Sequence, residues 1–153
     1  MLADNGNIKL TEPLYSRNGM ASNVDWITNA NNDAYNNVDY VKMYELGKRA
    51  FFFQGGPMDF SCASCHAENG KRIRLQDLPN LTEQKGAAMG WGYWPAYRVS
   101  SGQFWTMQQR LNDCYRQQRF PFPIYGSDVT IALSMYMAKT ANGGTVETPG
   151  LKR

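Results

Sequence analysis

Five residues, Cys62 to His66, constrain this chain more than any other stretch, because they form a C-x-x-C-H run. Two thiols one helical turn apart can each add to a vinyl group of the same porphyrin. The adjacent imidazole can then bind the iron as its proximal ligand. The run therefore predicts one covalent haem c, held by Cys62 and Cys65, with His66 on the iron.

Two other interpretations of the run are weaker. A redox dithiol has no need of the following His66, and it usually lies in a βαβ pattern that this sequence lacks. A zinc site could add Cys114 to complete a Cys3His set. However, Cys65 and His66 are neighbours in sequence, which makes joint tetrahedral ligation awkward.

The counts of cysteine and histidine limit the remaining chemistry. The chain has three cysteines, so Cys114 is left over once the haem has taken two. His66 is the one histidine, which excludes a bis-histidine haem without a ligand from another chain. It also excludes a Ser-His-Asp triad with a free imidazole. A net charge of +3 is too mild to indicate nucleic-acid binding.

The sequence is also informative about location. No apolar run approaches the ~20 residues that span a bilayer, and the N-terminus has no basic region followed by an apolar run. Covalent haem is normally installed outside the bacterial cytoplasm. We therefore expect no membrane span and a mature or truncated form of an exported, periplasmic protein.

The fold class expected is all-α, a class I cytochrome c-like domain around one haem. An Asn-rich irregular arm is expected over residues 1–38, because asparagine favours turns over helix interiors. The cytochrome domain follows over 39–145, and 146–153 form a tail. Pro and Gly punctuate 75–100, which is expected to be a loop.

Helices are expected over 39–53, 62–69, 101–118 and 127–140. Their predicted N-caps are Asp39, Ser101 and either Ser127 or Asp128. Gly47 inside the first of these helices costs about 1 kcal/mol relative to Ala, a cost that a close helix crossing would offset. In a class I cytochrome c the first and last helices cross in this way, so Gly47 is expected to meet Tyr136 or its neighbourhood.

The distal iron ligand is the open question at this point. Phe104, Met107, Leu111 and Cys114 step by three, four and three residues, which places them on one apolar stripe. Arg110 lies four residues before Cys114, so their side chains are neighbours. From the residues alone, the ligand is a Met (Met89 or Met107), a Lys, or Cys114.

Two segments resemble the SoxA family, the catalytic subunits of the SoxAX cytochromes of bacterial thiosulfate oxidation. One is Asp59–His66 with Gly70–Arg74, which matches the family's haem segment. The more specific one runs through Ser101–Gln103, Thr106–Gln108, Arg110–Cys114 and Arg119, around the family's active-site cysteine. The similarity covers roughly residues 40–140.

The resemblance implies a His66/Cys114 haem in which Cys114 is both distal ligand and catalyst, often as a persulfide. The implied reaction joins thiosulfate oxidatively to a cysteine of the carrier protein SoxYZ. Two electrons leave through haem, usually to a SoxX cytochrome subunit in a heterodimer. Many SoxA chains carry a further N-terminal cytochrome-like domain, which residues 1–38 do not match.

Thiosulfate is a dianion, so its site needs fixed positive charge. Arg110 can favour the thiolate form of Cys114 and hold the substrate. Further candidates are Arg116, Arg119, Lys71 and Arg74. Two alternatives stay open: an electron-transfer cytochrome with Met107 or Met89 on the iron, and a thiosulfate dehydrogenase that forms tetrathionate.

Overall fold

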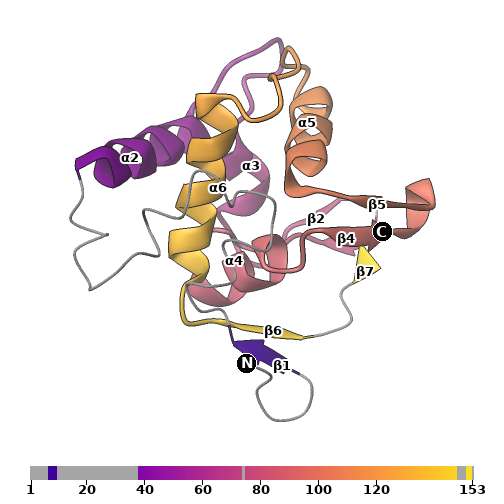
Figure 1. Ribbon diagram of the computed structural model, residues 1–153. Coiled ribbons are helices and arrows are strands. Elements are labelled where there is room, and N and C mark those ends of the chain that lie inside the picture. Colours follow the sequence, from indigo (N-terminus) through magenta and orange to yellow (C-terminus); the bar gives the residue numbers. More distant parts are fainter. Residues whose placement is uncertain (1–6, 10–37, 74, 148–150, 153) are drawn as a thin grey trace.

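Two helices, α2 (Val38–Phe52) and α6 (Asp128–Ala141), cross at the centre of the fold (Figure 1). The computed structural model describes residues 7–9, 38–73, 75–147 and 151–152. A Cβ on Gly47 would overlap the backbone carbonyl of Ala132 and lie 3.0 Å from Cβ of Tyr136. The close crossing predicted from Gly47 and Tyr136 is therefore confirmed. The Phe51 ring packs beside it, with its centroid 5.1 Å from that of Tyr136.

The starts of these two helices test the predicted caps. Helix α2 begins at Val38, so Asp39 lies in its first turn and the prediction of Asp39 as N-cap is wrong. A carboxylate in the first turn still complements the positive end of the helix dipole. Helix α6 has Ser127, one of the two predicted residues, as its N-cap, and Asp128 is its first residue.

A third helix, α4 (Gln84–Trp91), packs against α6, so the prediction of a loop over 75–100 is wrong. The glycines that suggested a loop instead lie where α4 packs closely against neighbouring segments. A Cβ on Gly86 would overlap the backbone of Asn80, and one on Gly90 would overlap the Leu81 side chain. Trp91 at the end of α4 is fully buried in the core.

Helix α5 (Met107–Gln117) is shorter than the predicted helix 101–118. Residues before it form an antiparallel hairpin of β4 (Ala96–Arg98) and β5 (Gln103–Trp105), joined by the 3-10 turn η5 (Val99–Ser101). Gly102 has a φ of 64°, which suits glycine and closes the hairpin. Thr106, not Ser101, is the N-cap of α5. Its backbone N–H donates to Oε1 of Gln109 at 2.7 Å, in a capping box.

The new boundary also corrects the apolar stripe. Phe104 lies on β5 with 74% of its surface exposed, so it does not belong to the stripe. Met107 and Leu111 are buried, as the stripe predicted.

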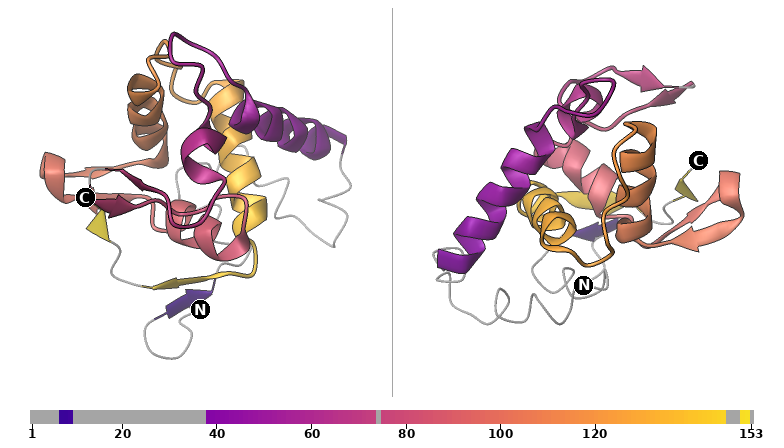
Figure 2. Two further views of the ribbon diagram at one scale, coloured as in Figure 1. Left: turned by 180° about the vertical axis from the view of Figure 1, so that it is seen from behind. Right: turned by 90° about the horizontal axis from the view of Figure 1, so that it is seen from above.

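Short strands join distant parts of the chain (Figure 2). Strand β1 (Asn7–Lys9) pairs antiparallel with β6 (Thr145–Glu147), and β7 (Leu151–Lys152) pairs parallel with β4. A small hairpin is formed by β2 (Arg72–Ile73) and β3 (Gln76–Asp77). The core is helical, as expected, but the sequence did not predict these strands. Apart from β1 and Val38, the predicted arm lies outside the described residues. No helix in the described part of the chain is long and apolar enough to cross a membrane.

Candidate haem and thiol site

The C-x-x-C-H run forms the short helix α3 (Cys62–His66), which ends three residues before the predicted boundary. Ser61 is its N-cap. The Ser61 backbone N–H donates to Oγ of Ser64 at 3.0 Å, and the Ser64 N–H donates to Oγ of Ser61 at 3.1 Å. This reciprocal cap holds the first turn in place. Because Cys62 and Cys65 are three residues apart in the sequence, this helical turn places both on one side of the helix.

His66 is oriented as a metal-binding imidazole. Its Nδ1 lies 2.9 Å from the carbonyl oxygen of Pro79. Because a carbonyl can only accept, Nδ1 carries the proton and Nε2 keeps its lone pair. Burial lowers the pKa of His66 and the charge of Arg110 acts in the same direction, although the bond to Pro79 opposes them. The imidazole is thus held neutral, with Nε2 as its metal-binding atom.

Cys114 on α5 is coupled electrostatically to the two motif cysteines. Burial raises the pKa of Cys114, the charge of Arg110 lowers it, and the charges of Asp113 and Cys65 raise it again. Burial and then the charge of Cys114 raise the pKa of Cys62 to about 12. The charge of Arg110 and those of the other two free thiols thus act in one electrostatically coupled group that includes Cys114.

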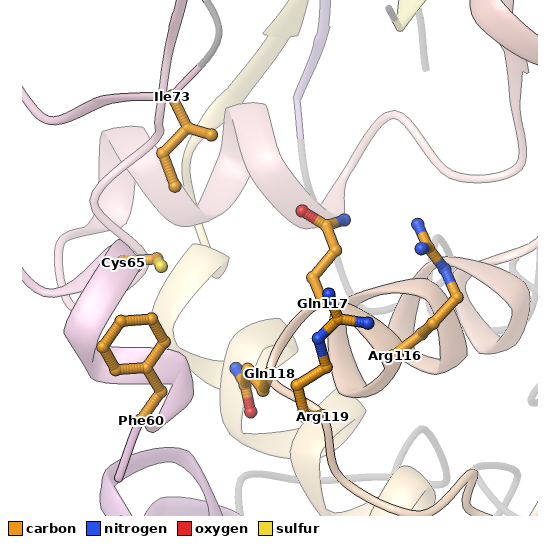
Figure 3. A pocket seen from close by; sticks show the side chains of 7 residues that line it. All are labelled: Phe60, Cys65, Ile73, Arg116, Gln117, Gln118 and Arg119. Carbon is orange, nitrogen blue, oxygen red and sulfur yellow. The ribbon is translucent and has the colours of Figure 1, made fainter. Parts of the chain in front are cut away.

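A pocket of about 220 Å³ opens between α3 and the C-terminal end of α5 (Figure 3). Its walls combine apolar side chains, a motif thiol and two cationic groups. The lining residues are Phe60, Cys65, Ile73, Arg116, Gln117, Gln118 and Arg119. Such a mixture suits a flat apolar ligand that carries negative groups at its edge.

Arg119 reaches this pocket through an unusual helix end. It adopts a φ of 63°, a left-handed conformation that helix ends normally give to glycine. The Arg119 N–H donates to the Arg116 carbonyl at 3.1 Å, and the Phe120 N–H donates to the Tyr115 carbonyl at 3.0 Å. This is the Schellman pattern, with the rings of Tyr115 and Phe120 5.7 Å apart. The predicted candidate Arg119 is thus fixed at the pocket.

The structure adds two residues that sequence reasoning missed. Asp113, one residue before Cys114, is buried and forms ion pairs with Arg98, Arg110 and Arg116. Arg98 comes from β4, 15 residues earlier. Nothing in the sequence links Arg98 to Asp113. A carboxylate next to the candidate cysteine was, however, a visible signal.

The remaining cation candidates lie elsewhere. Lys71 donates to the Ser64 carbonyl at 2.8 Å and pairs with Glu68 at 3.4 Å, so it fastens the end of α3. Arg74 lies outside the described residues.

The two methionine candidates are also placed. Met89 lies on α4 with 46% of its surface exposed, and Met107 is buried in the hydrophobic core. Neither methionine lines the pocket beside Cys65, and Cys114 does not line it either.

The residues present fit a haem c. Two free thiols on one helix face can form the thioethers, and the Nδ1–H of His66 is already engaged, so Nε2 can bind iron. Cys114 supplies a third sulfur nearby. Among the described residues, no cluster of three or more His, Cys, Asp or Glu side chains could hold a metal ion directly.

Sequence comparison gives long matches to one kind of protein. Over 112 residues the chain is 70% identical to "L-cysteine S-thiosulfotransferase subunit SoxA" of Hydrogenophilus thermoluteolus, a match that covers 73% of this chain and 41% of that protein. A protein of the same name from Hydrogenobacter thermophilus is 49% identical over 113 residues, with 73% and 42% covered. The chain thus spans about two fifths of the length of these relatives. No model of a known protein family matches it.

Solved structures agree with these matches. The crystal structure of SoxXA from P. pantotrophus contains a similar chain, with a TM-score of 0.61 and 29% identity, over 73% of this chain and 40% of that one. Thiosulfate dehydrogenase TsdBA from Marichromatium purpuratum is similar in fold alone, with a TM-score of 0.52 and 24% identity. This match covers 73% of the present chain and 25% of that one.

The motif, the third thiol and the shared fold define a chain of the c-type cytochrome class. Within that class, the chain belongs to the SoxA family. The resemblance seen in the sequence is thereby confirmed.

Proposed function

We propose that this chain is the haem-bearing domain of an L-cysteine S-thiosulfotransferase. It would join thiosulfate oxidatively to a cysteine on a SoxYZ-type carrier protein. The observation that carries the proposal is the position of Cys114, which a plain electron carrier does not need. Cys114 follows Arg110 by one helical turn on α5 and is coupled electrostatically to Arg110 and to Cys65 of the haem motif, in a chain of the SoxA family.

The net reaction sets what the site must do. A bond forms between the outer sulfur of thiosulfate and the carrier's cysteine sulfur, with release of one proton and two electrons. Haem c, when bound through Cys62, Cys65 and His66, supplies a route by which the electrons leave one at a time. We assign His66 and Cys114 as the iron ligands. Cys114 is also the reactive sulfur, and Arg110 is the group that holds the anion.

The chain's own residues have clear tasks in this scheme. Burial alone favours the neutral thiol of Cys114, whereas the adjacent Arg110 favours the thiolate. The same guanidinium can bind a sulfonate oxygen of thiosulfate with charge-assisted hydrogen bonds. Arg110 therefore serves both the nucleophile and the substrate.

We further propose a SoxX-type cytochrome as partner subunit and a periplasmic location. The relatives are named as subunits, and the similar solved chain comes from a structure of SoxXA. Covalent attachment of haem normally takes place outside the bacterial cytoplasm, which supports the location.

The test replaces Cys114 by Ala in the holoprotein and assays thiosulfate with the carrier. Wild type is expected to add thiosulfate to the carrier, as seen in the carrier's mass, and Cys114→Ala to add none and to show a changed haem spectrum. Met89→Ala, on the surface of α4, is the matched control and should leave both unchanged. Tetrathionate formed without the carrier would replace the proposal by a thiosulfate dehydrogenase. An unchanged spectrum in Cys114→Ala would indicate an ordinary electron carrier.

A further inference from the structure

We propose that Asp113 is a positioning residue that holds Arg98 and Arg110 together as a two-guanidinium anion site beside Cys114. The nature of the anion, a sulfur oxyanion, rests on the proposed function. The site itself rests on contacts between side chains that two different elements, β4 and α5, supply.

Asp113 is saturated with donors. Only 6% of its surface is exposed. Its Oδ2 accepts from Nη1 of Arg98 at 2.7 Å, from Nη1 of Arg110 at 3.0 Å and from Nε2 of Gln117 at 3.0 Å. Its Oδ1 accepts two bonds from Arg116, at 2.7 and 3.2 Å. A buried carboxylate with this many charge-assisted bonds fixes the positions of its donors as firmly as they fix it.

Arg98 and Arg110 meet on a single oxygen atom although they come from different elements. Arg98 lies on β4, where its Nε also donates to Oγ of Ser100 at 3.1 Å and its guanidinium lies 4.3 Å from the ring centroid of Trp105. Arg110 lies on α5. Their side chains are 16% and 26% exposed. Because both bind Oδ2 of Asp113, their guanidinium groups are held next to each other.

The charges of the cluster do not cancel. Three guanidinium groups face Asp113, and in the described residues they form ion pairs with no other carboxylate. The cluster therefore keeps two positive charges, the number that a dianion such as thiosulfate requires. Arg110 and Arg98 are both near enough to Cys114 to act on its thiol electrostatically. An anion bound to this pair would lie beside the reactive sulfur.

If charge alone mattered, the carboxylate of Asp113 would weaken anion binding at this site. A carboxylate next to an anion site repels the anion, so its removal should tighten binding on electrostatic grounds. Its benefit must come from orientation. Free arginine side chains lose rotamer freedom when they clamp an anion, and a preformed pair has already lost it. The two explanations therefore predict opposite signs for Asp113→Asn.

The experiment measures thiosulfate affinity of the holoprotein by calorimetry, together with KM and kcat in the carrier assay. For Asp113→Asn we expect affinity to fall about tenfold, as for the loss of one charge-assisted hydrogen bond. KM should rise by a similar factor, while kcat stays within about threefold of wild type, because binding of the ground state and of the transition state is weakened equally. Asp113→Glu should restore most of the affinity. Asp77→Asn, which removes the exposed pair between Arg72 and Asp77, is the matched control and should change nothing.

Equal or tighter binding by Asp113→Asn overturns the inference. Should that variant fail to fold with haem, Arg98→Gln tests the same site from the other side. Weaker thiosulfate binding then supports the inference, and unchanged binding refutes it. The proposed function can fail separately. If wild type adds no thiosulfate to the carrier but binds the anion through Arg98 and Arg110, the anion site stands without the transferase.

Discussion

Gly47→Ala tests the helix crossing on which the site is built. The substitution adds one methyl group to α2 at its point of contact with α6. That methyl would overlap the carbonyl oxygen of Ala132 and lie 3.0 Å from Cβ of Tyr136. Both belong to the rigid part of α6, so neither can rotate away. The helices must move apart instead.

Two opposing effects set the magnitude. Alanine favours a helix interior by about 1 kcal/mol over glycine. Overpacking of a well-packed core costs about 1–3 kcal/mol or more, and here separation also loosens the buried contacts of Phe51 and Leu133. Since backbone atoms are involved, we take the upper range and expect a net loss of about 2 kcal/mol. For a chain of this size, that corresponds to about 6 °C in Tm.

The assay is urea unfolding of the holoprotein followed by far-ultraviolet circular dichroism. Gly70→Ala is the control: a Cβ there has no neighbour within 4 Å, and its φ of 77° leaves only a backbone cost. Gly47→Ala should lose clearly more stability than Gly70→Ala. A Gly47→Ala protein as stable as wild type would refute the close crossing.

Three more predictions follow from the site. Ser61→Ala removes the N-cap of α3. It should lower the free energy of unfolding, measured in urea, by about 1 kcal/mol and reduce the amount of haem incorporated. Wild-type stability with full haem incorporation would contradict the capping role. Arg119→Gly relieves the left-handed backbone conformation of Arg119. The free energy of unfolding should rise by about 0.5–1 kcal/mol, seen as a higher Tm, and the haem spectrum should shift. A lower Tm would mean that the contacts of Arg119 outweigh its backbone strain. Burial would raise the pKa of Asp113, but its bonds to Arg98 and Arg116 hold it below the ordinary 3.8. The stability that this charge contributes is therefore present above pH 3.8 and is lost as the pH falls through the lower folded value. The free energy of unfolding should decline more steeply below about pH 4 in wild type than in Asp113→Asn, and parallel curves would contradict this.

The helical core and the motif could be predicted because their signals are local. An internal glycine with helical apolar spacing indicated a close helix crossing at Gly47, and the likeness to a class I cytochrome c supplied the region of Tyr136 as its partner. The predicted secondary structure of residues 84–105 was wrong for a physical reason. Gly86 and Gly90 suggested a loop, but they allow α4 to approach Asn80 and Leu81 closely, an effect that depends on the tertiary structure.

The wrong start of α5 had a local signal that was overlooked. Thr106 and Gln109 form a T-x-x-Q capping box, and a helix start at Thr106 leaves the preceding residues free to pair as strands. The position of Arg98 was beyond sequence reasoning. It depends on how the hairpin folds back onto α5, which a 15-residue separation does not determine.

The ligands of the iron are the central claim, and electron paramagnetic resonance of the oxidised holoprotein tests it most directly. We predict a low-spin ferric signal of the thiolate type, with His66 and Cys114 on the iron and one haem in the mass of the chain. The signal should be lost in Cys114→Ala. A His/Met signal with an unmodified Cys114 would contradict the account and leave an electron carrier.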